Sequence, residues 1–172
     1  MEFESDRGQV SEARRLLGEC GLFSGLGPDE RNALFARVRI RIRNFSAGDT
    51  IFLKGSPGDQ MMAVLDGNVR ISVSSGDGPA RVLAILRPGE LFGEIALLDG
   101  KERTADATAA TECSLATLDR GEILSFLDRY PSAWRYIAAV LCGRLRESEK
   151  HLAELSPQQV GRAPRQDKAA HE

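Results

Sequence analysis

The sequence contains few of the residues that hold metal ions or form disulfides. Its 172 residues include three cysteines, Cys20, Cys113 and Cys142, and no C-x-x-C pair. An iron–sulfur cluster needs four cysteine ligands, and a jelly-roll metalloenzyme needs two or three histidines within its strands. The two histidines, His151 and His171, lie near the C-terminal end. The composition therefore excludes both classes and favours reduced thiols in a cytoplasmic protein.

The sequence also lacks a large excess of either charge and a long apolar run. Its 23 Lys and Arg residues against 25 Asp and Glu residues argue against a nucleic-acid binder that relies on a large positive field. The first residues, MEFESDRGQ, are too polar for a secretory signal. No apolar run approaches the roughly 20 residues of a membrane span. We expect a cytoplasmic single domain with no membrane insertion.

The spacing of the apolar residues changes twice along the chain. Helical spacing comes first, then short alternating segments separated by glycines, and then helical spacing again. The sequence thus predicts a flexible N-terminus (residues 1–9), helices (10–37) and a strand region (38–119). A hinge with C-terminal helices (120–155) and a disordered polar tail (156–172) are expected to follow.

The middle zone predicts an antiparallel sandwich, roll or barrel, because many short strands follow one another with close turns. A first strand is expected from Val38, where apolar residues alternate with arginines. Further strands are expected at residues 50–53, 61–65, 69–73, 81–86, 104–109 and 113–118. Asp66-Gly67-Asn68 and Gly76-Asp77-Gly78 have the composition of hairpin turns.

The last helix is expected to begin near Ser132 and to continue to about Leu155. From Leu145 onward, positions 145, 148, 152 and 155 are spaced three, four and three residues apart, as in a coiled-coil seam. This spacing predicts self-association through the C-terminal helix.

One segment combines a flexible backbone position with two opposite charges. Gly93 permits a close approach of backbone to a ligand, and the residues after it form a short helical turn whose free N–H groups attract an anion. Nine residues after Glu94 comes Arg103, whose planar fork suits a phosphate, and Thr104 adds a hydroxyl. The Glu94 carboxylate accepts hydrogen bonds from a sugar hydroxyl. These residues predict a small phosphorylated sugar or nucleotide as ligand.

The segment FGEIALLDGKERTADA resembles the phosphate-binding cassette of the cyclic nucleotide-binding domain family. Members include catabolite activator-type regulators, protein kinase regulatory subunits and cyclic nucleotide-gated channels. The family pattern is F-G-E, an apolar stretch, a short gap and R-[TS]-A, and the resemblance covers roughly residues 20–150. It implies a mainly β fold with flanking helices: an antiparallel eight-stranded β-roll of the double-stranded β-helix or jelly-roll type, with N-terminal helices and a long C-terminal helix.

The resemblance also implies a role for each matching residue. Glu94 and the Gly93 backbone would hold the ribose 2'-hydroxyl, and Arg103 would pair with the cyclic phosphate. Ser148 would contact the purine across a dimer interface, although a shift of one residue would select Glu149 instead. The implied ligand-binding set is Gly93, Glu94, Ile95, Ala96, Arg103, Thr104, Ala105 and Ser148.

The resemblance predicts a non-enzymatic sensor without a cofactor, which binds cAMP first and cGMP second. Thr104 resembles the cGMP-preferring members, but both Ser and Thr occur with cAMP in bacterial-type domains. We expect a homodimer through the C-terminal helix, or an effector protein as partner. Direct DNA binding is not expected, because a helix-turn-helix would occupy about 70 residues after Leu155. Two alternatives stay open: a degenerate, non-binding oligomerisation or interaction scaffold, and a transcription regulator acting through a partner subunit.

Overall fold

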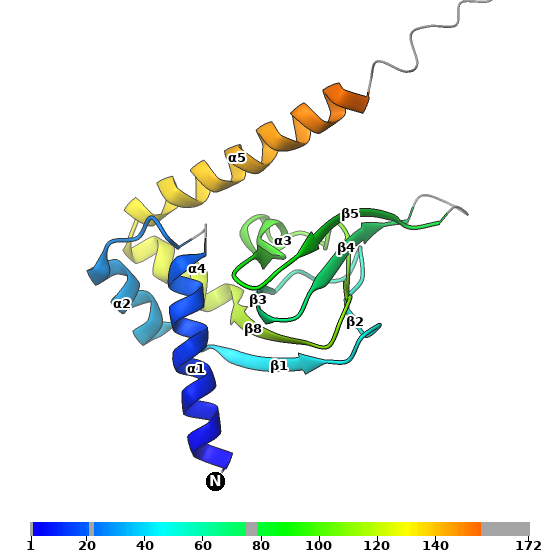
Figure 1. Cartoon of the computed structure of the whole chain (residues 1–172). Helices are drawn as coiled ribbons and strands as arrows, with labels where there is room; N and C mark the ends of the chain where they lie inside the picture. Colours follow the sequence, from blue (N-terminus) through cyan, green and yellow to red (C-terminus); the bar gives the residue numbers. More distant parts are fainter. Residues whose placement is uncertain (1, 21–22, 75–78, 156–172) are drawn as a thin grey trace, which may run out of the picture. The chain divides into compact units, whose positions relative to one another are not determined.

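The computed structural model describes residues 2–20, 23–74 and 79–155. The described residues form five helices, α1 (Glu2–Glu19), α2 (Pro28–Arg37), α3 (Glu94–Asp99), α4 (Arg120–Arg129) and α5 (Ser132–Leu155). They also form eight strands, β1 (Arg41–Phe45), β2 (Thr50–Phe52), β3 (Gln60–Asp66), β4 (Val69–Val73), β5 (Arg81–Leu86), β6 (Leu91–Phe92), β7 (Asp106–Ala109) and β8 (Cys113–Asp119) (Figure 1).

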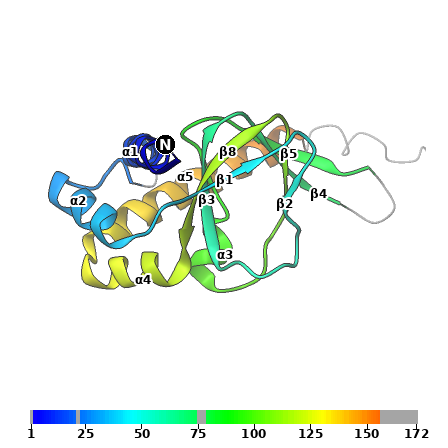
Figure 2. The same cartoon turned by 90° about the horizontal axis from the view of Figure 1, so that it is seen from below.

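The strands form two four-stranded antiparallel sheets. The strand order is β1-β8-β3-β6 in one sheet and β2-β7-β4-β5 in the other. Figures 1 and 2 show α1, α2 and α4 together at one end of the sheets, with β4 and β5 toward the other end. The expected mainly β roll with flanking helices is confirmed.

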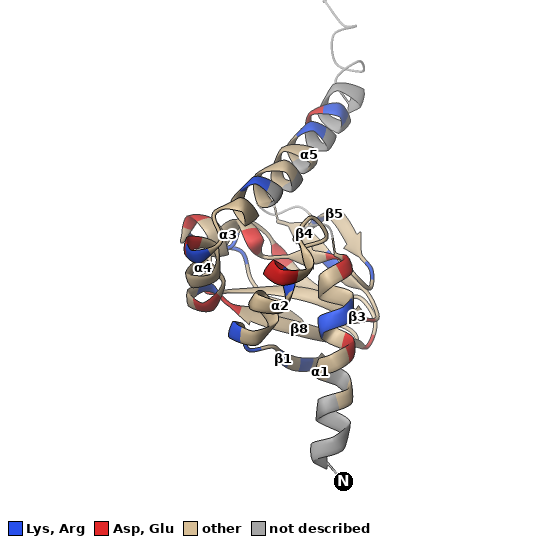
Figure 3. Ribbon diagram, turned by 90° about the vertical axis from the view of Figure 1, so that its left-hand side faces the viewer, with Lys and Arg blue, Asp and Glu red and all other residues tan. Residues whose placement is uncertain are grey.

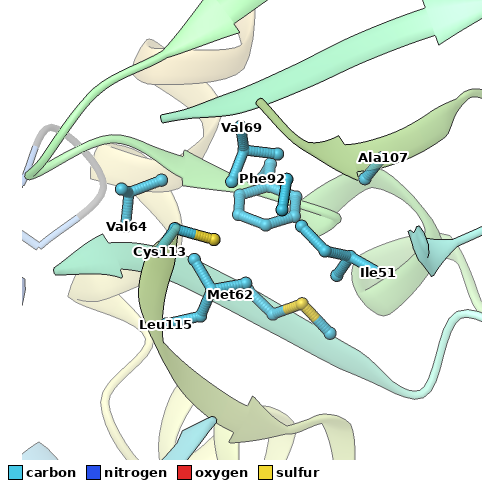
Figure 4. Packing of buried hydrophobic residues seen from close by; sticks show 9 residues of the cluster. Ile51, Met62, Val64, Val69, Phe92, Ala107, Cys113 and Leu115 are labelled. Atoms are coloured by element: carbon cyan, nitrogen blue, oxygen red, sulfur yellow. The ribbon is translucent and has the colours of Figure 1, made fainter. Parts of the chain in front are cut away.

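The core lies between the two sheets. Ile51, Val69 and Ala107 of one sheet pack with Met62 and Phe92 of the other, and Figure 4 shows these side chains pointing toward one another. Such burial stabilises the fold by roughly 25 cal/mol per Å² of apolar surface removed from water. The roll therefore provides a rigid frame on which loop residues are held.

The three cysteines differ in burial and share no common site. Cys20 and Cys113 are buried and Cys142 is exposed, and none of these three described cysteines is joined in a disulfide. Burial raises the pKa of the Cys113 thiol, and the carboxylates of Asp49 and Asp66 act in the same direction. Cys113 is therefore held in its neutral form, as suits a residue packed in the core.

Two boundaries near the N-terminus differ from the prediction. Helix α1 begins at Glu2, inside residues 1–9, which the sequence predicts to be flexible. The first strand begins at Arg41 rather than at Val38, although Val38 and Ile40 are buried.

The predicted hairpin at Asp66-Gly67-Asn68 is a turn between the two sheets. It joins β3 to β4, and these strands belong to different sheets. Gly67 has a φ of 75°, and a Cβ there would lie 2.0 Å from the Glu112 carbonyl oxygen. The second predicted turn, Gly76-Asp77-Gly78, lies outside the described residues; the strands on either side of it, β4 and β5, pair antiparallel.

The chain comprises two compact units, residues 1–137 and 138–172. Helix α5 has the bounds expected from the sequence. On the face shown in Figure 3, basic and acidic positions are interspersed along α4 and α5, in keeping with the near-neutral composition. Among the helices of the described residues, none combines the length and apolar character needed to cross a bilayer.

Candidate functional site

The site begins at a sharp backbone turn between β6 and α3. Gly93 is the N-cap of α3 with φ 77° and ψ 7°, and Gly100 ends the helix with φ 72°. Both angles lie in the left-handed region that glycine adopts without a steric penalty. The turn lets the chain leave the buried residue Phe92 and enter a six-residue helix at once. The predicted helical turn after Gly93 is thus confirmed.

A second glycine allows the loop before β3 to press against this helix. A Cβ at Gly58 would lie 2.1 Å from the Ala96 Cβ and 2.9 Å from the Lys101 carbonyl oxygen. Residue 58 must therefore be glycine for the loop and α3 to approach so closely. Sequence reasoning gave Gly58 no structural role, because no local pattern shows which distant backbone a glycine faces.

The backbone of Arg103 is tied to the segment that follows β2. The Arg103 N–H donates to the Ser56 carbonyl oxygen at 2.8 Å, and the Gly55 N–H donates to the Arg103 carbonyl oxygen at 2.9 Å. These bonds extend the pairing of β2 with β7 beyond the strand ends. The position of Arg103 is therefore set by the sheet and not by the loop alone.

The side chain of Arg103 is buried with 4% of its surface exposed. Its Nη1–H donates to the Gly93 carbonyl oxygen at 3.0 Å, and its Cζ lies 4.2 Å from the centroid of the Phe52 ring. Its Nε is buried and has no hydrogen-bond partner among the described residues. The guanidinium is thus held in place while its buried Nε donor stays unsatisfied.

The site combines this buried cation with the carboxylates of Asp59 and Glu94. Burial lowers the pKa of the Arg103 guanidinium, and the carboxylates of Asp59 and Glu94 act in the opposite direction. Glu94 is itself only 4% exposed. A buried charge is costly unless it is paired and hydrogen-bonded, and the Nε of Arg103 has no hydrogen-bond partner among the described residues.

The structure brings together the charged residues that the sequence singled out. Gly93 and Glu94 lie at the start of α3 beside Arg103. Ala96 and Ala105 are buried, whereas Thr104 and Ile95 are exposed. The side chain of Ser148 lies outside what the structure describes, so its role stays a prediction. Phe52, which sequence reasoning missed, is part of the site.

The comparisons with known proteins agree with this geometry. The family model of the cyclic nucleotide-binding domain matches residues 42–130, which include α3 and Arg103. The chain therefore belongs to the cyclic nucleotide-binding domain family. The predicted family membership is confirmed.

Individual proteins and solved structures also resemble the chain in sequence and in fold. The chain is 32% identical over 140 residues to the CRP-like cAMP-activated global transcriptional regulator of Mycobacterium tuberculosis, covering 81% of this chain and 62% of that protein. The crystal structure of the Thermus thermophilus catabolite activator protein matches with a TM-score of 0.69 and 38% identity, covering 79% of this chain and 63% of that one. The regulatory domain of Toxoplasma gondii PKA, co-crystallised with cAMP, matches with a TM-score of 0.63 and 28% identity, covering 70% of this chain and 45% of that one. The chain thus spans less than two thirds of the length of each of these proteins.

Proposed function

We propose that the chain binds a 3',5'-cyclic purine nucleotide, with cAMP preferred over cGMP, and that it acts as a regulatory sensor without catalysing a reaction. The observation that carries the proposal is the buried guanidinium of Arg103, whose Nε has no partner among the described residues. A buried donor without an acceptor is destabilising, and a phosphate oxygen would satisfy it.

Arg103 and Glu94 bind different parts of the nucleotide in this proposal. Arg103 pairs with the singly charged cyclic phosphate, because its planar fork offers parallel donors. Glu94 accepts a hydrogen bond from the ribose 2'-hydroxyl, and Thr104 adds a donor on the phosphate side. The 2'-hydroxyl is the only free ribose hydroxyl of a 3',5'-cyclic nucleotide, so one carboxylate is sufficient.

Binding is proposed to reach the C-terminal helices through α3. Arg120, the first residue of α4, donates from Nε to the Leu97 carbonyl oxygen at 2.7 Å, and its N–H donates to the Asp59 carbonyl oxygen at 2.8 Å. When ligand orders α3, Leu97 and Leu98 repack against the apolar side of α4, which includes the buried residues Ile123 and Leu127. The start of α5 then moves with α4.

The proposal includes a partner that senses this movement. Either a second copy of the chain meets the seam of α5, in which Leu145 is 60% exposed, or an effector protein does. We place the module in the cytoplasm, where cysteines outside disulfides, such as Cys113 and Cys142, stay reduced.

A calorimetric titration tests the proposal. We expect micromolar or tighter binding of cAMP, weaker binding of cGMP, and much weaker binding of 5'-AMP, which carries an extra charge and a free 3'-hydroxyl. Hydrogen exchange on the same samples is expected to slow in residues 120–137 at saturating cAMP. No heat and no thermal shift at millimolar cyclic nucleotide would contradict binding and favour a scaffold; binding with unchanged exchange would contradict only the signalling route.

Gly93→Ala is expected to weaken cAMP binding by roughly threefold to thirtyfold, that is by about 0.7–2 kcal/mol. The new Cβ would lie 2.4 Å from Arg103 Nη1, so the guanidinium must move aside. Gly89→Ala is the matched control, because Gly89 also has a positive φ (88°) but nothing lies within 4 Å of its Cβ position. Equal dissociation constants for the two variants in calorimetry would contradict the expectation.

A further inference from the structure

The Arg103 guanidinium lies over an aromatic ring that the sequence did not connect with it. Its Cζ is 4.2 Å from the centroid of Phe52, within the range over which a cation and a ring attract each other. Phe52 is the last residue of β2, and its backbone partner is Ala107 of β7. The sheet pairing therefore places the ring beside the arginine.

The ring of Phe52 is itself supported by a second aromatic ring. Phe52 packs against Phe92 with ring centroids 5.8 Å apart, and Phe92 is 4% exposed. Phe92 directly precedes Gly93, whose carbonyl oxygen accepts the hydrogen bond from Arg103 Nη1. Arg103, Phe52, Phe92 and Gly93 thus form a closed ring of contacts, and each residue restricts the movement of its neighbour in this ring.

These contacts restrict the orientation of the Arg103 guanidinium. The guanidinium carbon lies over the Phe52 ring, and Nη1 donates to the Gly93 carbonyl oxygen. The buried Nε has no partner among the described residues, so it is the donor that a phosphate oxygen would satisfy. An aliphatic side chain at position 52 would still fill space, but it would not attract the cation or match its flat shape.

We propose that Phe52 is a positioning residue that orients Arg103 for the cyclic phosphate and so sets the affinity for the nucleotide. This inference rests on the proposed function. It goes further in assigning part of the affinity to a side chain of the roll that carries no polar group.

Calorimetry with cAMP on Phe52→Leu and Phe52→Met tests the inference. We expect a loss of affinity of about twofold to thirtyfold, the range of a cation–π contact converted to a binding constant. Phe52→Tyr keeps the ring and is expected to bind within about twofold of the wild type. Methionine has nearly the volume of leucine but a flexible unbranched chain that fills irregular gaps, so Phe52→Met provides the measurement if Phe52→Leu lowers the melting temperature strongly.

Phe45→Leu is the matched control. Phe45 also packs against the hydrophobic core and also carries an arginine over its ring, Arg43, with Cζ 4.9 Å from the centroid. Arg43 lies on β1 and is not part of the site. The same substitution there is expected to change the melting temperature without changing the affinity for cAMP.

A double-mutant cycle separates positioning from general packing. In an Arg103→Ala background the guanidinium is absent, so Phe52→Leu is expected to have a much smaller effect on affinity than in the wild type. Equal effects in both backgrounds, or wild-type affinity in Phe52→Leu, would overturn the inference. If the wild-type chain binds no cyclic nucleotide, the proposed function fails as well, and that result is distinct from the other two.

Discussion

Replacing Arg103 with alanine is expected to weaken cAMP binding by roughly tenfold to a hundredfold. A hydrogen bond to a charged group contributes about 1.5–3 kcal/mol, and each 1.4 kcal/mol corresponds to a factor of ten in affinity. The buried position of Arg103, with 4% of its surface exposed, keeps water from replacing the lost contact. A calorimetric titration of the variant measures the effect directly.

Two variants complete that experiment. Arg103→Lys keeps the charge but not the planar fork, so its affinity should fall between those of the wild type and the alanine variant. Arg43→Ala removes an exposed arginine that also lies over a phenylalanine ring, and it should bind like the wild type. If Arg103→Ala also binds like the wild type, the nucleotide site lies elsewhere.

Gly67→Ala is expected to lower the free energy of unfolding by about 2–5 kcal/mol. A left-handed backbone conformation costs an L-residue roughly 1–2 kcal/mol, and overpacking typically adds about 1–3 kcal/mol. Here φ is 75° and the Cβ would lie 2.0 Å from the Glu112 carbonyl oxygen and 2.8 Å from the Cys113 Cα. Because these atoms belong to the backbone, they cannot move aside as a flexible side chain would.

Thermal unfolding followed by circular dichroism measures this loss. For a chain of this size each kcal/mol lowers the melting temperature by roughly 2–4 °C. Gly48→Ala is the matched control, since Gly48 has a φ of 92° with nothing within 4 Å of its Cβ position. It should therefore lose only the conformational term. A melting temperature of Gly67→Ala equal to that of Gly48→Ala would contradict the expectation and show that the backbone at Glu112 and Cys113 shifts at little cost.

Much of the fold could be predicted because the signals are local. Short segments of strand character between glycines predicted β4 and β5 with the bounds that the structure has, and helical spacing predicted α5. The two-residue strand β6 was missed, since two residues show no period. The hairpin expected at Gly67 was wrong, because a glycine-containing turn has the same composition whether its strands pair or enter different sheets.

The sequence by itself determined the chemistry of the candidate site. Gly93, Glu94 and Arg103 supply a sharp turn, a carboxylate and a guanidinium, and each is a property of the residue type and of a short spacing. Because these features depend only on residue type and on short spacing, they can be identified before the structure is known.

Only the tertiary structure decided how these groups are held. Phe52 meets Arg103 because β2 pairs with β7, and Gly58 meets Ala96 because a loop crosses α3. Both contacts join segments far apart in the chain, and their geometry depends on how the two sheets pack. No local period or motif encodes that packing, which arises from the burial of the whole core at once.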